Sequence, residues 1–172
     1  MFRQLLPVLF LSVSSISLAQ PDTLYVPEGA NTVAYAVRYP ALQKAESFTH
    51  VGHFELDTTH IAVRLGYKRG KPCGVYRAYY PDGRPLIFAV YGWGGPNGDW
   101  TEYGPDGLIT VKGQYNEGKR DGKWAFRDQG IVGHYKNGKK HGKWKYFENG
   151  RVIRTEKYRN DSLVTGSRFL FK

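Results

Sequence analysis

The chain has 172 residues and a formal net charge of +10, with 21 glycines and 26 aromatic residues (4 Trp, 13 Tyr and 9 Phe). Its length indicates one domain. A single cysteine excludes an intrachain disulfide scaffold and a cysteine-based zinc finger. A mean hydropathy of −0.51 excludes a protein with many membrane spans. The aromatic content of 15% supplies enough apolar surface to exclude a chain that is disordered throughout.

Residues 1–20 have the composition of a secretory signal peptide. Arg3 precedes an apolar run of about 14 residues, which is shorter than the roughly 20 residues of a membrane-spanning helix. Ser17-Leu18-Ala19 places small residues where signal peptidase needs them. We therefore predict residues 1–19 to be removed by cleavage after Ala19. The mature protein is then secreted or periplasmic, peripheral to the envelope at most, with no transmembrane segment. An uncleaved N-terminal anchor is the alternative.

Residues 20–65 contain no copy of the repeat described below. Thr32–Tyr39, Gly52–Leu56 and Ile61–Tyr67 are predicted strands, the last two joined by a turn at 57–60. Pro40–Ser47 is predicted to form one or two helical turns, because proline is favoured early in a helix. A segment of about 45 residues is marginal by itself without disulfides or metal. We expect it to extend and cap the sheet that follows.

A Gly-x-aromatic element recurs along residues 66–172, which hold 19 of the glycines and 19 of the aromatic residues. Its glycines are spaced by 24, 24, 20 and 24 residues, which indicates five units of a structural repeat. The most complete copy is 133–150, and the last, at Gly166-Ser167-Arg168, is degenerate. The repeat signature comprises Gly74, Tyr76, Gly98, Trp100, Tyr115, Gly122, Trp124, Tyr135, Gly142, Trp144, Tyr146 and Gly150.

Each unit has the pattern of a β-hairpin. In 143–146 (Lys-Trp-Lys-Tyr) the alternation places two rings on one face of a strand and two lysines on the other. Asp82-Gly83, Asp106-Gly107 and Asn149-Gly150 predict tight turns, and the glycine before each ring predicts a bend or a close backbone approach. One hairpin alone is marginal, so the units must stack. We predict an all-β protein: a single extended, twisted antiparallel meander of repeated β-hairpins with a short N-terminal β cap.

The pattern Gly-x-Tyr-x-x-Gly-Lys-(Lys/Arg)-x-Gly-Lys-Trp-x-(Tyr/Phe), at 113–126 and 133–147, resembles the bacterial variant of the MORN repeat. The resemblance covers about 66–172. It implies an elongated sheet of hairpins that scaffolds or binds proteins or phospholipids, without shared catalytic residues, and proteins of this kind are often described as antitoxin-like. The sequence departs at 92–98 (Gly-Trp-Gly-Gly-Pro-Asn-Gly), which replaces the usual Lys-rich turn, and at Arg168, which replaces the tryptophan.

Groupings typical of enzymes and metal sites are weak in this chain. His53 and His60 have two acids between them, but their spacing on a strand and a loop fits no recognised metal geometry. The sequence has no nucleophile elbow and no phosphate-loop ending. We expect no enzymatic activity, no metal and no cofactor, and we interpret Cys73 as a half-buried thiol or an interchain partner. The acids that recur among the copies are interpreted as turn residues: Asp82, Asp106 and Asp121.

The positive charge is concentrated in residues 112–159, which hold 14 Lys or Arg and 5 Asp or Glu, for a net charge of +9. Lys136, Lys143 and Lys145 are predicted to project from the face opposite the rings. Such a field attracts acidic proteins and anionic lipids or glycans, and export disfavours nucleic acid as the partner. The alternative is that these lysines only keep a one-layer sheet soluble. The candidate partner-binding residues are Lys119, Arg120, Lys123, Lys136, Lys139, Lys140, Lys143 and Lys145.

These features favour a non-enzymatic, exported binding or scaffolding module as the first hypothesis. The second is an envelope-associated module that binds anionic lipid or glycan through its basic repeats. The third, an antitoxin-like protein that neutralises a partner, rests on the family resemblance alone.

Overall fold

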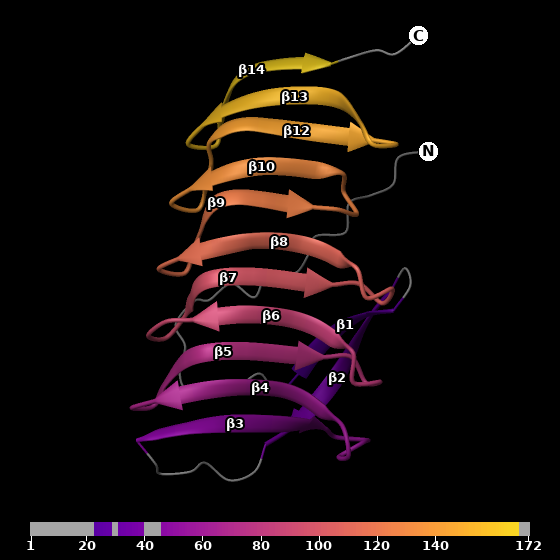
Figure 1. Cartoon of the computed structure of the whole chain (residues 1–172), viewed down its shortest axis with the longest axis vertical. Helices are drawn as coiled ribbons and strands as arrows, with labels where there is room; N and C mark the ends of the chain where they lie inside the picture. The colour runs from indigo at the N-terminus through magenta and orange to yellow at the C-terminus, as the bar shows by residue number, and fades with distance from the viewer. Residues whose placement is uncertain (1–22, 29–30, 40–45, 169–172) are drawn as a thin grey trace.

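The computed structural model describes residues 23–28, 31–39 and 46–168, and it contains no helix among them. The strands form one open antiparallel sheet of 14 strands, in which β1 to β10 and then β12 to β14 are neighbours in chain order and β11 pairs with β10. Figure 1 shows β3 to β14 stacked like rungs from the indigo end to the yellow end. The prediction of an all-β meander of repeated hairpins is confirmed.

The strands are, in chain order, β1 (Thr23–Glu28), β2 (Asn31–Arg38), β3 (Ser47–Phe54), β4 (Ile61–Lys68), β5 (Lys71–Tyr79), β6 (Pro85–Tyr91), β7 (Pro96–Tyr103), β8 (Ile109–Asn116), β9 (Lys119–Phe126), β10 (Ile131–Lys136), β11 (Lys139–Lys140), β12 (Gly142–Glu148), β13 (Arg151–Arg159) and β14 (Ser162–Arg168). The predicted strands at 32–39, 52–56 and 61–67 correspond to β2, β3 and β4, and β3 begins earlier than predicted. The sequence did not predict β1. The predicted signal peptide and most of the predicted helix, 40–45, lie outside the described residues.

The hairpin turns follow the predicted chemistry. At the predicted turn Asn149-Gly150, φ is 48° and 73°, the positive values that a tight primed hairpin turn requires. Asp82 and Asp106 stabilise their turns differently, since each carboxylate accepts a hydrogen bond from the backbone N–H two residues on, at 3.0 Å. The interpretation of Asp121 as a turn residue is wrong, because it lies inside β9, where no turn needs a cap.

The sequence assigned the strand bend and the close backbone approach to one glycine of each unit, but they occur at two different glycines. Gly122 and Gly142, just before the rings, have φ of 72° and 74° and bend their strands. The close approach occurs instead at Gly113 and Gly133 on the preceding strands. A Cβ atom at Gly133 would overlap the indole of Trp144, and Gly113 relates in the same way to Trp124. The tryptophan of each of these units therefore lies flat on a glycine of the neighbouring strand.

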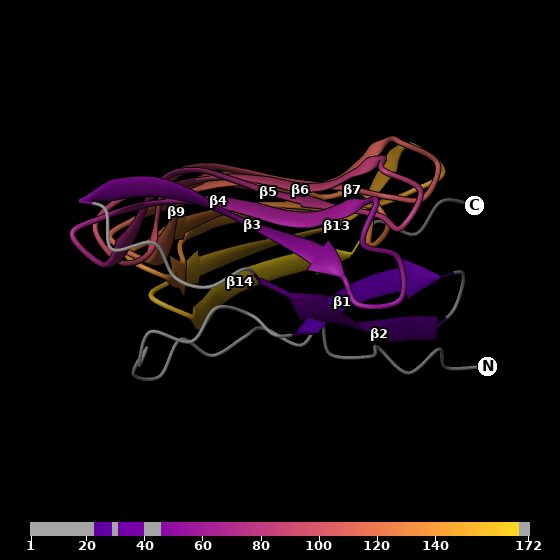
Figure 2. The same ribbon diagram turned by 90° about the horizontal axis from the view of Figure 1, so that it is seen from below.

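The β1–β2 hairpin joins the sheet at β3 and folds back against one of its faces. β2 pairs with β3 at only two positions, Val37 with Phe54 and Arg38 with His53. Figure 2 shows the hairpin lying beneath the strands that start the array. The N-terminal segment is thus attached to the end of the sheet, and it also covers one face of it.

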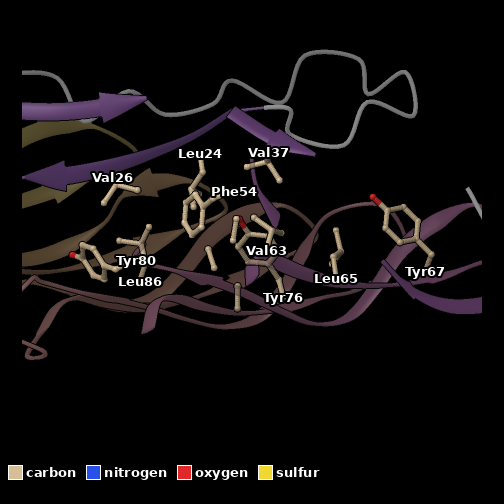
Figure 3. Close-up of a cluster of buried hydrophobic side chains, with 13 residues drawn as sticks. Leu24, Val26, Val37, Phe54, Val63, Leu65, Tyr67, Tyr76, Tyr80 and Leu86 are labelled. Atoms are coloured by element: carbon tan, nitrogen blue, oxygen red, sulfur yellow. The ribbon is translucent and has the colours of Figure 1, made fainter. Parts of the chain in front are cut away.

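A single hydrophobic cluster fills the space between this hairpin and the sheet. Leu24 and Val26 of β1 pack there with Phe54, Val63 and Tyr76 from three successive strands of the array (Figure 3). Val26 is completely buried. Burial of this apolar surface holds the hairpin in place.

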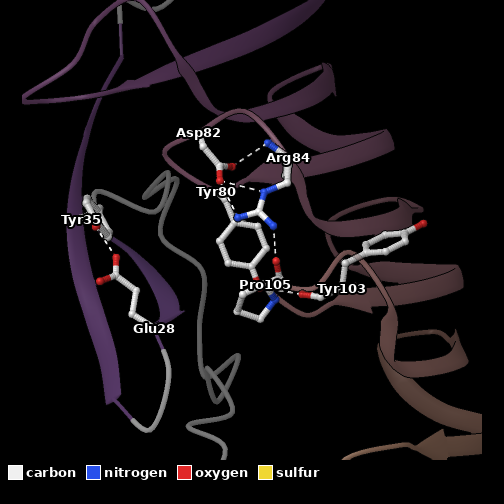
Figure 4. Close-up of polar contacts among 7 residues, drawn as sticks. All are labelled: Glu28, Tyr35, Tyr80, Asp82, Arg84, Tyr103 and Pro105. Atoms are coloured by element: carbon white, nitrogen blue, oxygen red, sulfur yellow. Dashed lines mark hydrogen bonds and ion pairs between the residues drawn. The ribbon is translucent and has the colours of Figure 1, made fainter.

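Polar contacts reinforce the same region (Figure 4). The Tyr35 hydroxyl donates a hydrogen bond to the Glu28 carboxylate across the β1–β2 hairpin. The hydroxyl of Tyr80 donates to the carbonyl oxygen of Tyr103 at 2.8 Å. Arg84 binds the Asp82 carboxylate of its own turn and the carbonyl oxygen of Pro105 in the next. Successive turns along this edge are therefore tied together.

Candidate functional site

The register of the strands divides the array into two faces. Residues directly opposite each other in an antiparallel pair share a face, and neighbours along a strand alternate between faces. The face that carries Trp100, Trp124 and Trp144 is called the ring face here. The opposite one, which carries Lys123 and Lys143, is called the lysine face. The predicted separation of rings from these lysines follows from this register.

The rings form a continuous ladder from β7 to β13 on the ring face. Neighbouring ring centroids are 5.2 Å apart from Trp100 to Tyr115 and from Tyr115 to Trp124, and 6.1 Å from Trp124 to Tyr135. They are 5.0 Å apart from Tyr135 to Trp144, and the ladder then ends at Tyr158. All these contacts are edge-to-face, the arrangement that ring quadrupoles favour. The ladder is the structural core of the C-terminal units.

Two of the candidate cations belong to this ladder. The Arg120 guanidinium carbon lies 4.5 Å from the Trp124 ring centroid, and Arg120 Nη1 donates to the Tyr135 hydroxyl at 3.1 Å. Lys140 Nζ lies 4.4 Å from the Trp144 ring centroid. Trp124 and Trp144 are 0% and 2% exposed. The eight candidates therefore do not form one surface, because these two cations cover indoles on the ring face.

The ring face also holds two acids with perturbed ionisation. Burial raises the pKa of Glu102, whose carboxylate accepts a hydrogen bond from Trp100 Nε1 at 2.8 Å. Burial would also raise the pKa of Glu156, but hydrogen bonds from Tyr146 and Tyr158, at 2.5 and 2.7 Å, lower it overall. The two acids lie on β7 and β13, five strand spacings or about 24 Å apart along the sheet. They cannot act as a catalytic pair on one substrate bond.

The lysine face of β8 to β13 brings five lysines together. Lys143 lies directly opposite Lys157 across β12 and β13, and Lys123 lies opposite His134 across β9 and β10. Lys145 shares this face and lies opposite Val132 and Thr155 on its two neighbouring strands. The five members are Lys112, Lys123, Lys143, Lys145 and Lys157, and within the described part of the chain none of them forms an ion pair.

Two members of this group, Lys112 and Lys157, were not among the candidates that the sequence pattern indicated. Lys157 precedes Tyr158 of the ladder, so strand alternation alone places it on the lysine face. Lys112 shares the face because its partner across β8 and β9 is Ala125. The same face has another opposed pair of cations at the start of the array, Arg64 and Arg77, where Arg77 also packs over the Phe88 ring at 5.8 Å.

The remaining candidates lie where hairpins turn. Lys136 and Lys139 are paired across the β10–β11 turn, and Lys119 begins β9 opposite Asn116. All three are exposed. The turn at Gly138 is tied to the preceding hairpin by a hydrogen bond from its N–H to the Arg120 carbonyl, 2.8 Å. These cations border the five lysines at one edge of the sheet.

The histidine and acid grouping at the β3–β4 turn is used internally. His60 Nδ1 lies 2.7 Å from the Asp57 carboxylate. Hydrogen bonds from Thr59, and then from His60, lower the pKa of Asp57 to about 2. No cluster of three or more residues able to ligate a metal is found in the described ranges. Cys73 is a half-buried free thiol on β5.

The described part of the chain holds no helix with the length and apolar character needed to cross a bilayer. No protein-family model and no curated protein matches the chain. The resemblance to bacterial MORN-repeat variants stays a prediction from the sequence pattern.

Proposed function

We propose that this chain is a non-enzymatic, exported binding module, and that the lysine face of β8 to β13 binds an anionic partner. The observation that carries the proposal is the gathering of five lysines on one face of neighbouring strands, with Lys143 and Lys157 directly opposed. Like charges in that position destabilise a sheet. Scattered lysines would supply the same net charge and solubility without this cost.

The resemblance to bacterial MORN-repeat variants supports the same proposal, because that family implies binding or scaffolding and no shared catalytic residues. The predicted signal peptide supports a partner at the envelope or outside the cell. Electrostatic attraction from an exposed lysine cluster is long-range and is screened by salt, with a Debye length of about 8 Å at physiological ionic strength. Binding is therefore expected to weaken as salt is added.

The test compares two double variants that each remove two opposed cations from the same face. Lys143→Gln with Lys157→Gln removes the pair within the lysine cluster, and Arg64→Gln with Arg77→Gln removes the pair at the start of the array. The purified proteins are titrated at low and high salt with poly-glutamate, and with phosphatidylcholine vesicles with and without phosphatidylglycerol. We expect the first variant to lose most of the salt-sensitive binding and the second to keep it.

Equal losses in the two double variants would mean that net charge alone drives binding, and the proposal would be wrong. Absence of binding to every anionic probe would also contradict it. Thermal unfolding of both variants checks that the fold is retained.

A further inference from the structure

An apolar hollow opens within the lysine face. Its volume is about 290 Å³, and Ala125, Val132, Ile109 and Phe147 line it together with Lys112. Ala125 and Val132 are direct partners across β9 and β10, so they share the floor. The floor of the hollow thus lies on the lysine face, and two cations line it, Lys112 and Arg127.

The hollow exists because one position of the repeat carries a small residue. The residue that follows the anchor ring of each unit points to the lysine face: Arg77 after Tyr76, Thr101 after Trp100, Ala125 after Trp124 and Lys145 after Trp144. Long side chains occupy two of these positions, Arg77 and Lys145. At the third unit the alanine leaves the space open, and Val132 beside it adds only a short apolar side chain.

Two lysines flank this floor at a fixed spacing. The register runs from Lys112 to Ala125, from Ala125 to Val132 and from Val132 to Lys145, each pair on adjacent strands. Three strand spacings of 4.7–4.9 Å place the two lysine positions about 14 Å apart, with the apolar floor between them. A cation therefore stands on either side of an apolar site.

We infer that the partner is an acidic polypeptide segment that lies across β8 to β12 in an extended conformation, with one apolar side chain in the hollow and an acidic residue two positions away on each side. In an extended chain, residues i, i+2 and i+4 point the same way, and four residues span about 14 Å. That spacing matches the distance from Lys112 to Lys145. The inference rests on the proposed function and specifies its partner.

An apolar anchor within a charged rim is the arrangement in which a few residues supply most of the energy of protein–protein binding. A glycan or a phosphate backbone carries no apolar side chain to fill the space above Ala125. A lipid surface offers negative charge without the fixed apolar spacing. Charge complementarity and the hollow together therefore favour a polypeptide.

Three blocked peptides test the inference by their dissociation constants in NMR titrations of the full-length protein. Glu-Ser-Phe-Ser-Glu has the inferred spacing, Glu-Ser-Ser-Ser-Glu keeps the charge without the anchor, and Glu-Glu-Phe-Ser-Ser keeps the composition with the wrong spacing. We expect the first to bind about tenfold more tightly than either of the others, a difference that corresponds to about 1.4 kcal/mol. The largest shifts are expected at the amides beside Ala125 and Val132.

Substitutions in and beside the hollow test whether the preference for the first peptide arises there. Ala125→Leu fills the hollow and is expected to abolish the preference for the first peptide. Thr155→Leu is the matched control, because Thr155 lies on the same face opposite Lys145 and outside the hollow. Val132→Ser makes part of the floor polar without adding volume, so it tests the same point if Ala125→Leu fails to fold.

Equal binding of all three peptides would overturn this inference but leave the proposed function standing. Tighter binding to phosphatidylglycerol vesicles than to the first peptide would also overturn it, in favour of a lipid partner. A protein that binds no peptide, no poly-glutamate and no vesicle would contradict both proposals.

Discussion

The two ends of the array close the same face of the sheet in different ways. Below β3 to β6, the apolar residues of β1 and β2 form a second layer, and Val26 is completely buried there. Along β8 to β13, the tryptophans are buried just as fully, but by neighbouring rings and by the side chains of Arg120 and Lys140. An aliphatic layer covers one half, and rings with cations above them cover the other.

This difference links the charge of the chain to its packing. Arginine and lysine have apolar stems and a cationic end that is attracted to the face of a ring, so they can cover an indole and still remain in contact with water. Arg120 and Lys140 are therefore part of the fold, while the five lysines of the opposite face make no ion pair among the described residues. The basic half of the chain therefore contains two kinds of cation, those that cover rings and those on the lysine face. Mutations should distinguish their effects on stability and on binding.

The largest effect is expected from Trp124→Ala, which would break the ladder at a fully buried ring. Removing a large buried aromatic side chain costs about 3–5 kcal/mol in the free energy of unfolding. Urea denaturation measures it. Trp93→Ala is the control, because Trp93 is 61% exposed and its loss should change stability by less than about 0.5 kcal/mol. Equal losses would show that the ladder is not the core of this half.

Val26→Ala tests the aliphatic layer. Val26 is 0% exposed, and loss of part of this buried side chain is expected to cost about 1.5–3 kcal/mol. Because the units of an array contact mainly their neighbours, amide exchange should increase in β1 to β6 and stay unchanged in β9 to β12. Tyr25→Ala, at the exposed neighbouring position, is the control. A uniform increase along the array would contradict this division into two halves.

Arg120→Gln tests the cation above the ladder. Loss of its contacts with Trp124 and Tyr135 is expected to lower the free energy of unfolding by about 0.5–2 kcal/mol, without a change in anion binding. Intrinsic tryptophan fluorescence should shift to the red as the indole gains water. A variant that binds poly-glutamate less well but unfolds normally would assign Arg120 to the partner surface instead.

Lys157→Glu is expected to stabilise the fold, in contrast to the three substitutions above. Replacing one of two directly opposed lysines by an acid is expected to raise the free energy of unfolding by about 0.2–1 kcal/mol at low salt. The same substitution should weaken anion binding. Thermal unfolding and poly-glutamate titration measure the two effects. If the variant is more stable and binds as tightly as before, the opposed lysines do not serve binding.

The smallest effect is expected at the exposed β3–β4 turn. The pKa of Asp57 is about 2 in the folded protein and about 3.9 in an unfolded chain. Since the folded value is the lower one, the stabilisation is complete above about pH 4 and is lost as the pH falls toward 2. The difference in denaturation midpoint between the wild type and Asp57→Asn should shrink over that window. A difference independent of pH would contradict the assigned hydrogen bonds.

Most of the array could be predicted because its signals are local. Alternation along 143–146 places rings and lysines on opposite faces, and Asn149-Gly150 has the backbone freedom that a tight turn requires. Counting by twos back from Trp124 also reaches Arg120, so its face could have been predicted, although its contact with the ring could not. Asp121 was misassigned because a short acid before a glycine has the same local pattern in a strand as in a turn.

The sequence by itself determined the repeat, the antiparallel meander and the faces on which most of the rings and lysines lie, because each depends on residues only a few positions apart. Only the tertiary structure decided that β1 and β2 cover the start of the array, since Leu24 and Phe54 belong to one buried cluster although they are far apart in the chain. It also decided that Ala125 forms the floor of a hollow between Lys112 and Lys145. That surface is assembled from four strands, and its geometry depends on their register.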